Sequence, residues 1–337
     1  QARIANADTK LLRRLLADLS IDALDHDGMI TRTDKAYRKW AARFLDDMRR
    51  FDALDLRALD DGQLRAQFDS MEQSLLKHYR LIRYGMVTHS IGMNLMLKRW
   101  LTDWLDDRSG ALYSKLISGL PGNRTIQTNI ALAKLARLAK EDGDVLKPLT
   151  TLSSSEFLVR MRNDKGLDAY ASAFDSFISE YGHRSHTREI FFPRWKDDPT
   201  LVVDVIRSLV GSSRLDLEEL ERRKIAERLE AERDILGRVS RLRWGFGKKV
   251  IFKTVLKYAQ IYLVFRENQR FYLDHQILRQ RRLFMEYGRR LHERGLLSDP
   301  TDVFFLSKEA VFDAAGGRAQ GDVKALTGAW RKELETK

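Results

Sequence analysis

Apolar side chains recur every three or four residues over long stretches of this chain, and this spacing is the strongest constraint on its fold. One such stripe comprises Leu64, Phe68, Met71, Leu75, His78, Leu81 and Ile82. Positions three and four apart share one face of an α-helix, so the stripe predicts a helix with one buried side. Only five prolines occur in 337 residues. We therefore predict an all-α fold, an irregular multi-helix domain with long helices and at most one or two short strands.

Breaks in this periodicity at glycine, proline and turn-forming residues indicate where the helices end. We predict helices over residues 3–19, 32–51, 61–106 with weak points at Gly85 and Gly92, 125–140 with Thr125 as a cap, 154–181, 200–210, 213–243 and 249–294. A loop is expected over 118–124, a short strand or extended piece over 302–306, and a loop at Gly316 and Gly317. The 213–243 helix has only a thin apolar seam and is expected to form a partly exposed arm.

The charge balance favours an anionic small ligand or an anionic partner domain. Lys and Arg number 60 against 48 Asp and Glu, a net charge of +12. The charges are interleaved along helices, as in residues 218–224, and no polybasic block or base-reading motif occurs, so we expect no nucleic-acid partner. Cysteine is absent, which fits a reducing compartment, and no apolar run is long enough to span a bilayer. We expect a cytoplasmic protein with no membrane partner.

The segment from Tyr181 to Pro199 has the densest mixture of polar side chains between predicted helices. It contains two histidines, three arginines, a glutamate and a tryptophan. His183 can act as a general base for an acceptor hydroxyl, because histidine titrates near neutral pH, or it can pin the loop by hydrogen bonds. A metal site at His183 and His186 would need further ligands, and no carboxylate cluster is spaced to supply them. We expect no metal.

A second constellation is the pair Arg266 and Arg270, which lie four residues apart on one helical face. Their neighbours along that face are Ala259, Tyr262, Leu273 and Ile277, a pattern that predicts an inward stripe. Two inward cations need anions. Either Glu267, Glu189 or another acid pairs with them, or they hold a phosphoryl group or substrate oxyanion. Both interpretations remain open from the residues alone.

The order of several motifs resembles the central helical domain of the phosphoenolpyruvate synthase and rifampicin phosphotransferase family. The matching positions are Gly182, His183, Arg184, Glu189, Pro193, Arg194, Trp195, Asp198 and Pro199, with residues 119–125 upstream and residues 266–271 and 302–306 downstream. The resemblance spans roughly residues 55–310. It implies N-terminal helices over 1–54, an acceptor-substrate-binding domain over 55–310, and a C-terminal segment over 311–337 that leads to a swivelling domain.

The resemblance also implies a function. A phosphohistidine on a separate mobile domain would pass its phosphoryl group to a small-molecule hydroxyl or enolate bound here. His183, Arg266 and Arg270 would be catalytic, although Arg270 stands where the family's enzyme carries Lys. The residues expected to bind substrate are Arg184, Glu189, Arg194, Gly119, Asn123 and Tyr262. Among them, Glu189 is expected to orient Arg184 or Arg266.

Cofactors and partners follow from the same resemblance. This chain itself would bind no cofactor, and ATP and Mg would sit on an ATP-grasp domain. The ATP-grasp and phosphohistidine swivelling domains would be partners in cis or as separate subunits. Two alternatives remain. The domain could serve an ATP-dependent condensing enzyme similar to the prodigiosin-forming one, or it could be a non-catalytic interaction module that binds through the 213–243 arm.

Overall fold

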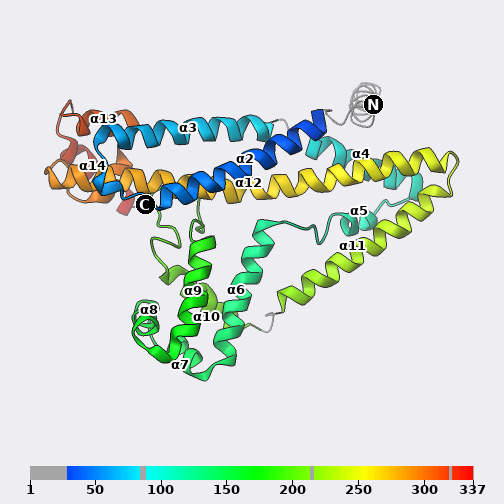
Figure 1. Cartoon of the computed structure of the whole chain (residues 1–337), viewed down its shortest axis with the longest axis horizontal. Coiled ribbons are helices and arrows are strands. Elements are labelled where there is room, and N and C mark those ends of the chain that lie inside the picture. The colour runs from blue at the N-terminus through cyan, green and yellow to red at the C-terminus, as the bar shows by residue number, and fades with distance from the viewer. Residues whose placement is uncertain (1–28, 84–88, 213–215, 319–320, 337) are drawn as a thin grey trace. The chain divides into compact units, whose positions relative to one another are not determined.

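The protein is all-α over the residues described by the computed structural model, namely 29–83, 89–212, 216–318 and 321–336 (Figure 1). No strand occurs in these ranges. The described residues form thirteen α-helices and three short 3-10 helices in this order: α2 Met29–Asp52, η1 Leu56–Ala58, α3 Asp61–Arg83, α4 Gly92–Leu105, α5 Ala111–Leu116, α6 Arg124–Glu141, α7 Gly143–Thr151, α8 Ser154–Asn163, η3 Lys165–Leu167, α9 Asp168–Tyr181, α10 Thr200–Val210, α11 Leu217–Ser240, α12 Gly245–Glu293, η4 Pro300–Phe305, α13 Lys308–Ala315 and α14 Val323–Glu335. The predicted fold class is confirmed, while the predicted 3–19 helix lies outside the described residues.

Three local predictions are corrected by capping interactions. The helix expected to begin at a Thr125 cap is α6, and its cap is Asn123, whose side chain accepts hydrogen bonds from the backbone N–H groups of Thr125 and Ile126. The helix expected over 154–181 is divided into α8, η3 and α9, because Asp164 ends α8 and caps η3. The piece expected to be extended at 302–306 lies largely within η4, which a reciprocal pair of hydrogen bonds between Asp299 and Asp302 initiates.

The long helix expected over 61–106 is two helices in the described residues. α3 ends at Arg83 and α4 begins at Gly92, one of the two predicted weak points. The other, Gly85, lies outside the described residues. No described helix is both long and apolar enough to cross a bilayer.

The described chain divides into two compact units, and α12 contributes to both. The first unit comprises the described residues of Gln1–Ala42, Lys77–Phe177 and Val202–Phe271, and the second comprises Arg43–Leu76, Ile178–Leu201 and Tyr272–Lys337. These limits rest on spatial proximity and differ from the domain boundaries at 54 and 310 inferred above. Those boundaries stay predictions.

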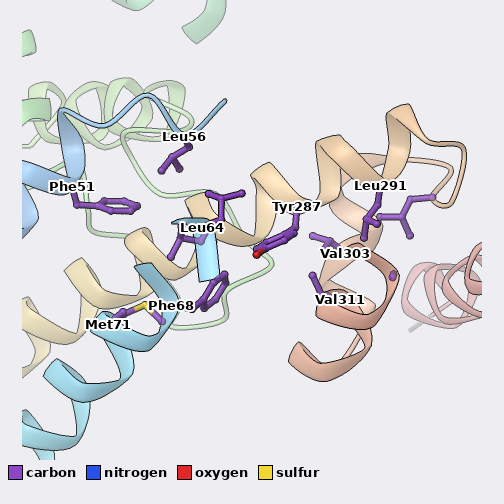
Figure 2. Packing of buried hydrophobic residues seen from close by; sticks show 12 residues of the cluster. Phe51, Leu56, Leu64, Phe68, Met71, Tyr287, Leu291, Val303 and Val311 are labelled. Carbon is purple, nitrogen blue, oxygen red and sulfur yellow. The ribbon is translucent and has the colours of Figure 1, made fainter. Parts of the chain in front are cut away.

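The second unit is built on a core between α3, the later part of α12 and the segments that follow it. Figure 2 shows Leu64, Phe68 and Met71 of α3 on the same core as Tyr287 of α12. The rings of Phe68 and Tyr287 lie 6.0 Å apart. The remaining buried members of this cluster are Phe51, Leu56, Leu283, Leu291, Leu297, Val303, Val311 and Ala314. The first three positions of the apolar stripe read from the sequence therefore lie in this core, while His78 and the positions after it belong to the first unit.

The first unit places the opening half of α12 against several shorter helices. On α12, Phe252, Val255, Ala259 and Tyr262 are fully buried. Other buried residues of the same unit come from α4, α5, α6 and α11 and include Leu97, Leu101, Leu116, Ala136, Ile235 and Val239. Leu220 and Leu229 of α11 remain exposed. The expected partly exposed arm is thus confirmed as α11.

Candidate functional site

The predicted site residues are divided between the two units. The second unit contains His183, Arg184, Glu189 and Arg194, and the first contains Gly119, Asn123, Tyr262, Arg266 and Arg270. Each group is therefore assessed within its own unit.

We call residues 182–199 the polar loop, and Arg194 organises it from the inside. Its side chain is fully buried, and its guanidinium donates to the backbone carbonyls of Thr187 at 2.6 Å and Glu189 at 3.0 Å. Burial lowers the pKa of Arg194, and the nearby charge of Asp274 opposes this shift. The prediction that Arg194 binds substrate is untested, but a buried side chain bonded to two carbonyls of its own loop has a structural role.

Arg281 of α12, a buried residue that is not part of the loop, also holds the loop in place. Its guanidinium donates to Asp197 at 3.0 Å and to the carbonyls of Ile190 at 2.7 Å and Phe191 at 2.5 Å. Its side chain is only 9% exposed. The sequence interpretation missed this residue, because nothing in the local pattern shows that residue 281 lies beside residues 190–197. The spacing of buried residues on α12 is the one signal that could have placed Arg281 inside.

His183 is buried and stacked rather than open to a ligand. It is 2% exposed, and its ring lies parallel to that of His275 at 3.5 Å between centroids. Glu189 is exposed, and the atom through which it contacts Arg194 is its backbone carbonyl oxygen. Arg184 is also buried. These positions support the interpretation that His183 pins the loop, while its catalytic role remains untested.

Two hollows can be compared as candidate sites. One of about 700 Å³ in the second unit is lined in part by Pro193, Arg281 and Glu286. In this hollow, the carboxylate of Glu286 already accepts hydrogen bonds from Arg289 and Arg290. The other, of about 290 Å³, lies in the first unit. Its lining includes three of the predicted site residues, Gly119, Asn123 and Arg266, although Arg266 is far from the other two in sequence. We take this second hollow as the candidate site and call it the loop pocket.

The loop pocket has an apolar wall and charged side chains of both signs. Its full lining is Ile117, Ser118, Gly119, Leu120, Asn123, Ile126, Glu221, Lys224, Leu263, Val264, Arg266 and Glu267. These residues come from the 117–123 loop, α6, α11 and α12. A hollow lined by apolar side chains with a few polar groups is the usual form of a small-molecule site.

Two helices hold the loop in place. Arg228 of α11 donates to the carbonyl of Gly119 at 3.2 Å, and Gln260 of α12 donates to the carbonyl of Leu116 at 2.8 Å. Gly119 has a positive φ of 54°, and a Cβ there would lie 2.6 Å from the backbone nitrogen of Ile225. Glycine is therefore required at this position both by backbone conformation and by the close approach of α11.

The backbone donors at the start of α6 are already used. Asn268 of α12 accepts a hydrogen bond from the N–H of Arg124 at 2.9 Å and donates to the carbonyl of Gly122 at 2.8 Å. Asn123 accepts from the next two N–H groups. The loop therefore does not offer these amides to a phosphate, and attraction for an anion falls to the side chains of Arg266 and Lys224.

Arg266 lies at the pocket but not in the interior. Its side chain is 43% exposed and pairs with Glu267 at 2.9 Å. Arg270 is also exposed and is not part of the loop-pocket lining. The prediction of an inward arginine pair is wrong, because a shared helical face is buried only where another element covers it. The pairing of Arg266 with Glu267 was one of the two alternatives left open.

Tyr262 is buried and is not among the residues that line the loop pocket. It is fully buried and stacks on His89 at 4.8 Å, while its neighbours Leu263 and Val264 line the pocket.

The fold and the pocket define an all-α domain with a small, loop-lined, charged hollow. The family described as the rifampicin phosphotransferase fourth domain matches residues 81–267, more than half of the chain, and the chain belongs to this family. The resemblance drawn from the motif order is thus confirmed at the level of the family. The matched range includes the loop pocket and the polar loop but ends before Arg270.

Three curated relatives share this region. Chondramide synthase cmdD from Chondromyces crocatus is 31% identical over 241 residues, which are 71% of this chain and 6% of that protein. Rifampicin phosphotransferase from Streptomyces sviceus is 23% identical, covering 76% of this chain and 30% of that protein. Prodigiosin synthesizing transferase PigC from Serratia marcescens is 24% identical, covering 74% and 28%. This chain spans less than a third of the length of each of these relatives.

Proposed function

We propose that this chain is the acceptor-substrate-binding domain of an ATP-dependent phosphotransferase. A phosphohistidine on a separate mobile domain would donate the phosphoryl group, and a small-molecule hydroxyl or enolate bound in the loop pocket would receive it. ATP and Mg would be bound by an ATP-grasp domain, in cis or on another subunit. The task of this chain would be to bind the acceptor and to stabilise charge on the moving phosphoryl group.

The observation that supports this proposal is the position of Arg266. Its guanidinium is partly exposed, it pairs with the carboxylate of Glu267, and it shares the lining of the pocket with a loop that Arg228 holds by a hydrogen bond. An incoming phosphoryl group could compete with Glu267 for the guanidinium, which suits the bidentate binding of phosphate oxygens. Lys224, on the same lining, adds a second cation.

The test compares Arg266→Ala with Arg160→Ala in a preparation that contains the ATP-grasp and phosphohistidine domains. Arg160 is a matched control, because it is 54% exposed and pairs with one carboxylate, Asp164. We expect Arg266→Ala to leave phosphohistidine formation from ATP intact and to slow transfer to the acceptor by about 100-fold or more. Unchanged transfer in Arg266→Ala, or an equal loss in Arg160→Ala, would refute the role of Arg266.

A second function is favoured by the similarity to PigC. In this alternative the same pocket binds a substrate that is activated with phosphate and then joined to another molecule. Analysis of the products separates the two functions. A stable phosphoester supports phosphotransfer, and a condensed product with free phosphate supports ligation.

A further inference from the structure

The turn that joins α11 to α12 presents two aromatic rings to solvent. We call residues 241–251 the hairpin tip. Trp244 is 79% exposed and Phe246 is 84% exposed, the two highest values among the large exposed apolar side chains described. Figure 1 shows α11 and α12 converging on this turn. Exposed aromatic side chains at one place indicate a contact surface, because isolated rings gain nothing from exposure.

The backbone of the tip is fixed in the shape that exposes these rings. Trp244 has a φ of 61°, the left-handed region that is unfavourable for a residue with a Cβ. A Cβ on Gly245 would lie 2.0 Å from the carbonyl oxygen of Ser240, so this turn needs glycine next to Trp244. The ring of Trp244 is exposed, so packing of the tip itself does not account for the strain. Strain that persists without such an account points to a role outside the fold.

The tip is supported from below by a packed aromatic base. Phe252 is fully buried, and its ring lies 6.4 Å from those of Trp100 and Trp104. The ammonium of Lys248 lies 5.1 Å above the Trp104 ring. The tip therefore projects from a rigid base, which keeps the entropy cost of binding low.

The charge of the tip has one sign. No acidic residue occurs between Asp234 and Glu267, while eight Lys and Arg do: Arg238, Arg241, Arg243, Lys248, Lys249, Lys253, Lys257 and Arg266. The interleaving of charges expected from residues 218–224 does not extend to this stretch. Arg238 pairs with Asp234 at 3.6 Å and Arg266 with Glu267 at 2.9 Å, while Asp103 pairs with Arg99 and Asp106 with Arg108. Within the tip itself, Arg241, Arg243, Lys248 and Lys249 accompany the two aromatic side chains, and no acidic residue lies among them in the sequence.

We propose that the hairpin tip docks onto an acidic protein domain, with the Trp244 and Phe246 rings in an apolar hollow and the surrounding lysines and arginines on its acidic rim. Charge complementarity selects an acidic surface. Trp and Arg are also the residue types most enriched at the centres of protein interfaces. The relatives carry more than two thirds of their length outside the region shared with this chain, so further protein accompanies this domain in them.

A lipid surface fits the tip less well. The exposed apolar side chains of α12 end with Ile251, so no apolar face continues along the helix to lie in a bilayer interface. A contact made by two exposed rings and a few cations fits a brief docking event rather than a permanent interface. This inference goes beyond the proposed function and does not depend on phosphoryl transfer.

Photocrosslinking in the native host tests the proposal. Phe246 is replaced by p-benzoylphenylalanine in the complete protein, and the cross-linked peptides are identified by mass spectrometry. The same replacement at Trp330, which is 51% exposed in the second unit, is the control. We expect the residue 246 probe to mark one acidic protein segment that the residue 330 probe does not mark.

Charge reversal makes the result decisive. The double variant Lys249→Glu and Lys253→Glu, with an unchanged circular dichroism spectrum, should lower the cross-link yield about tenfold, and changing two acids of the marked segment to Lys should restore it. Cross-links to lipid, to nucleic acid or to a second copy of this chain would overturn the proposal. A yield that is insensitive to charge reversal would overturn it as well. Because cross-linking needs no turnover, failure of the proposed phosphotransfer would leave this readout unaffected.

Discussion

Removing the Arg281 guanidinium should destabilise the second unit more than removing its sequence neighbour Arg282. Arg281 loses an ion pair with Asp197 and two hydrogen bonds to backbone carbonyls, while Arg282 loses one ion pair with Asp52 at 2.7 Å. Each guanidinium also lies over a phenylalanine ring, at 5.0 and 5.1 Å, so the loss of this contact is matched between the two variants.

The expected magnitudes differ because burial differs. The Arg281 side chain is 9% exposed, and breaking a buried ion pair costs about 3–5 kcal/mol. Asp197 is 29% exposed and can recover water, so we expect a loss of about 2–4 kcal/mol in the free energy of unfolding. Arg282 and Asp52 are 26% and 40% exposed, and a pair of this kind contributes about 0–1 kcal/mol. Arg281→Lys keeps the charge but cannot reach all three acceptors, so its loss should be intermediate.

Urea denaturation followed by circular dichroism measures the difference between the variants. Hydrogen exchange of residues 182–199 shows whether the loop itself is released, because Arg281 contacts this segment. We expect faster exchange there in Arg281→Ala than in Arg282→Ala. Losses that agree within about 0.5 kcal/mol, with the same exchange in the loop, would refute the argument that Arg281 holds the polar loop.

Two further predictions concern the first unit. Burial lowers the pKa of His78 from its ordinary value of 6.5 to about 4. Between these two pH values the unfolded chain binds a proton at His78 and the folded protein does not, so the free energy of unfolding should fall by up to about 3 kcal/mol as the pH falls from 6.5 to 4. Urea titrations of His78→Phe should lack this loss. Gly119→Ala should cost more than about 3 kcal/mol, because its Cβ would meet the α11 backbone. Gly122→Ala, with a φ of 80° and open space around the new Cβ, should cost about 1–2 kcal/mol. Thermal unfolding checks this pair, and equal melting temperatures would contradict the role of close packing at Gly119.

Much of the fold follows from local patterns in the chain. The apolar stripe from Leu64 to Met71 predicts α3 and its buried side, and the helix predicted over 200–210 is α10. These signals involve residues within a few positions of one another, where helical spacing and capping act. The cap at Asn123 was missed for a related reason. Asn and Thr both favour this position, and their order along the chain does not decide between them.

The candidate site was predicted less completely. Gly119, Asn123 and Arg266 were named from the sequence and meet in the loop pocket. Lys224, Glu221 and Asn268 were not given roles, because their importance depends on contacts with the 117–123 loop. The prediction that Arg266 is buried was wrong for the same reason, because helical spacing shows which residues share a face and does not show which element covers that face.

The sequence by itself determined that the chain is helical, where most turns fall and which family it resembles, since these depend on neighbouring residues and on motif order. Only the tertiary structure decided that Arg194 and Arg281 face backbone carbonyls, that Arg266 borders a hollow, and that Trp244 and Phe246 are left exposed. The physical reason is that burial and pairing belong to contacts between segments far apart in the chain. A guanidinium group that is buried can stabilise a loop through hydrogen bonds, and one that is partly exposed can attract an anion.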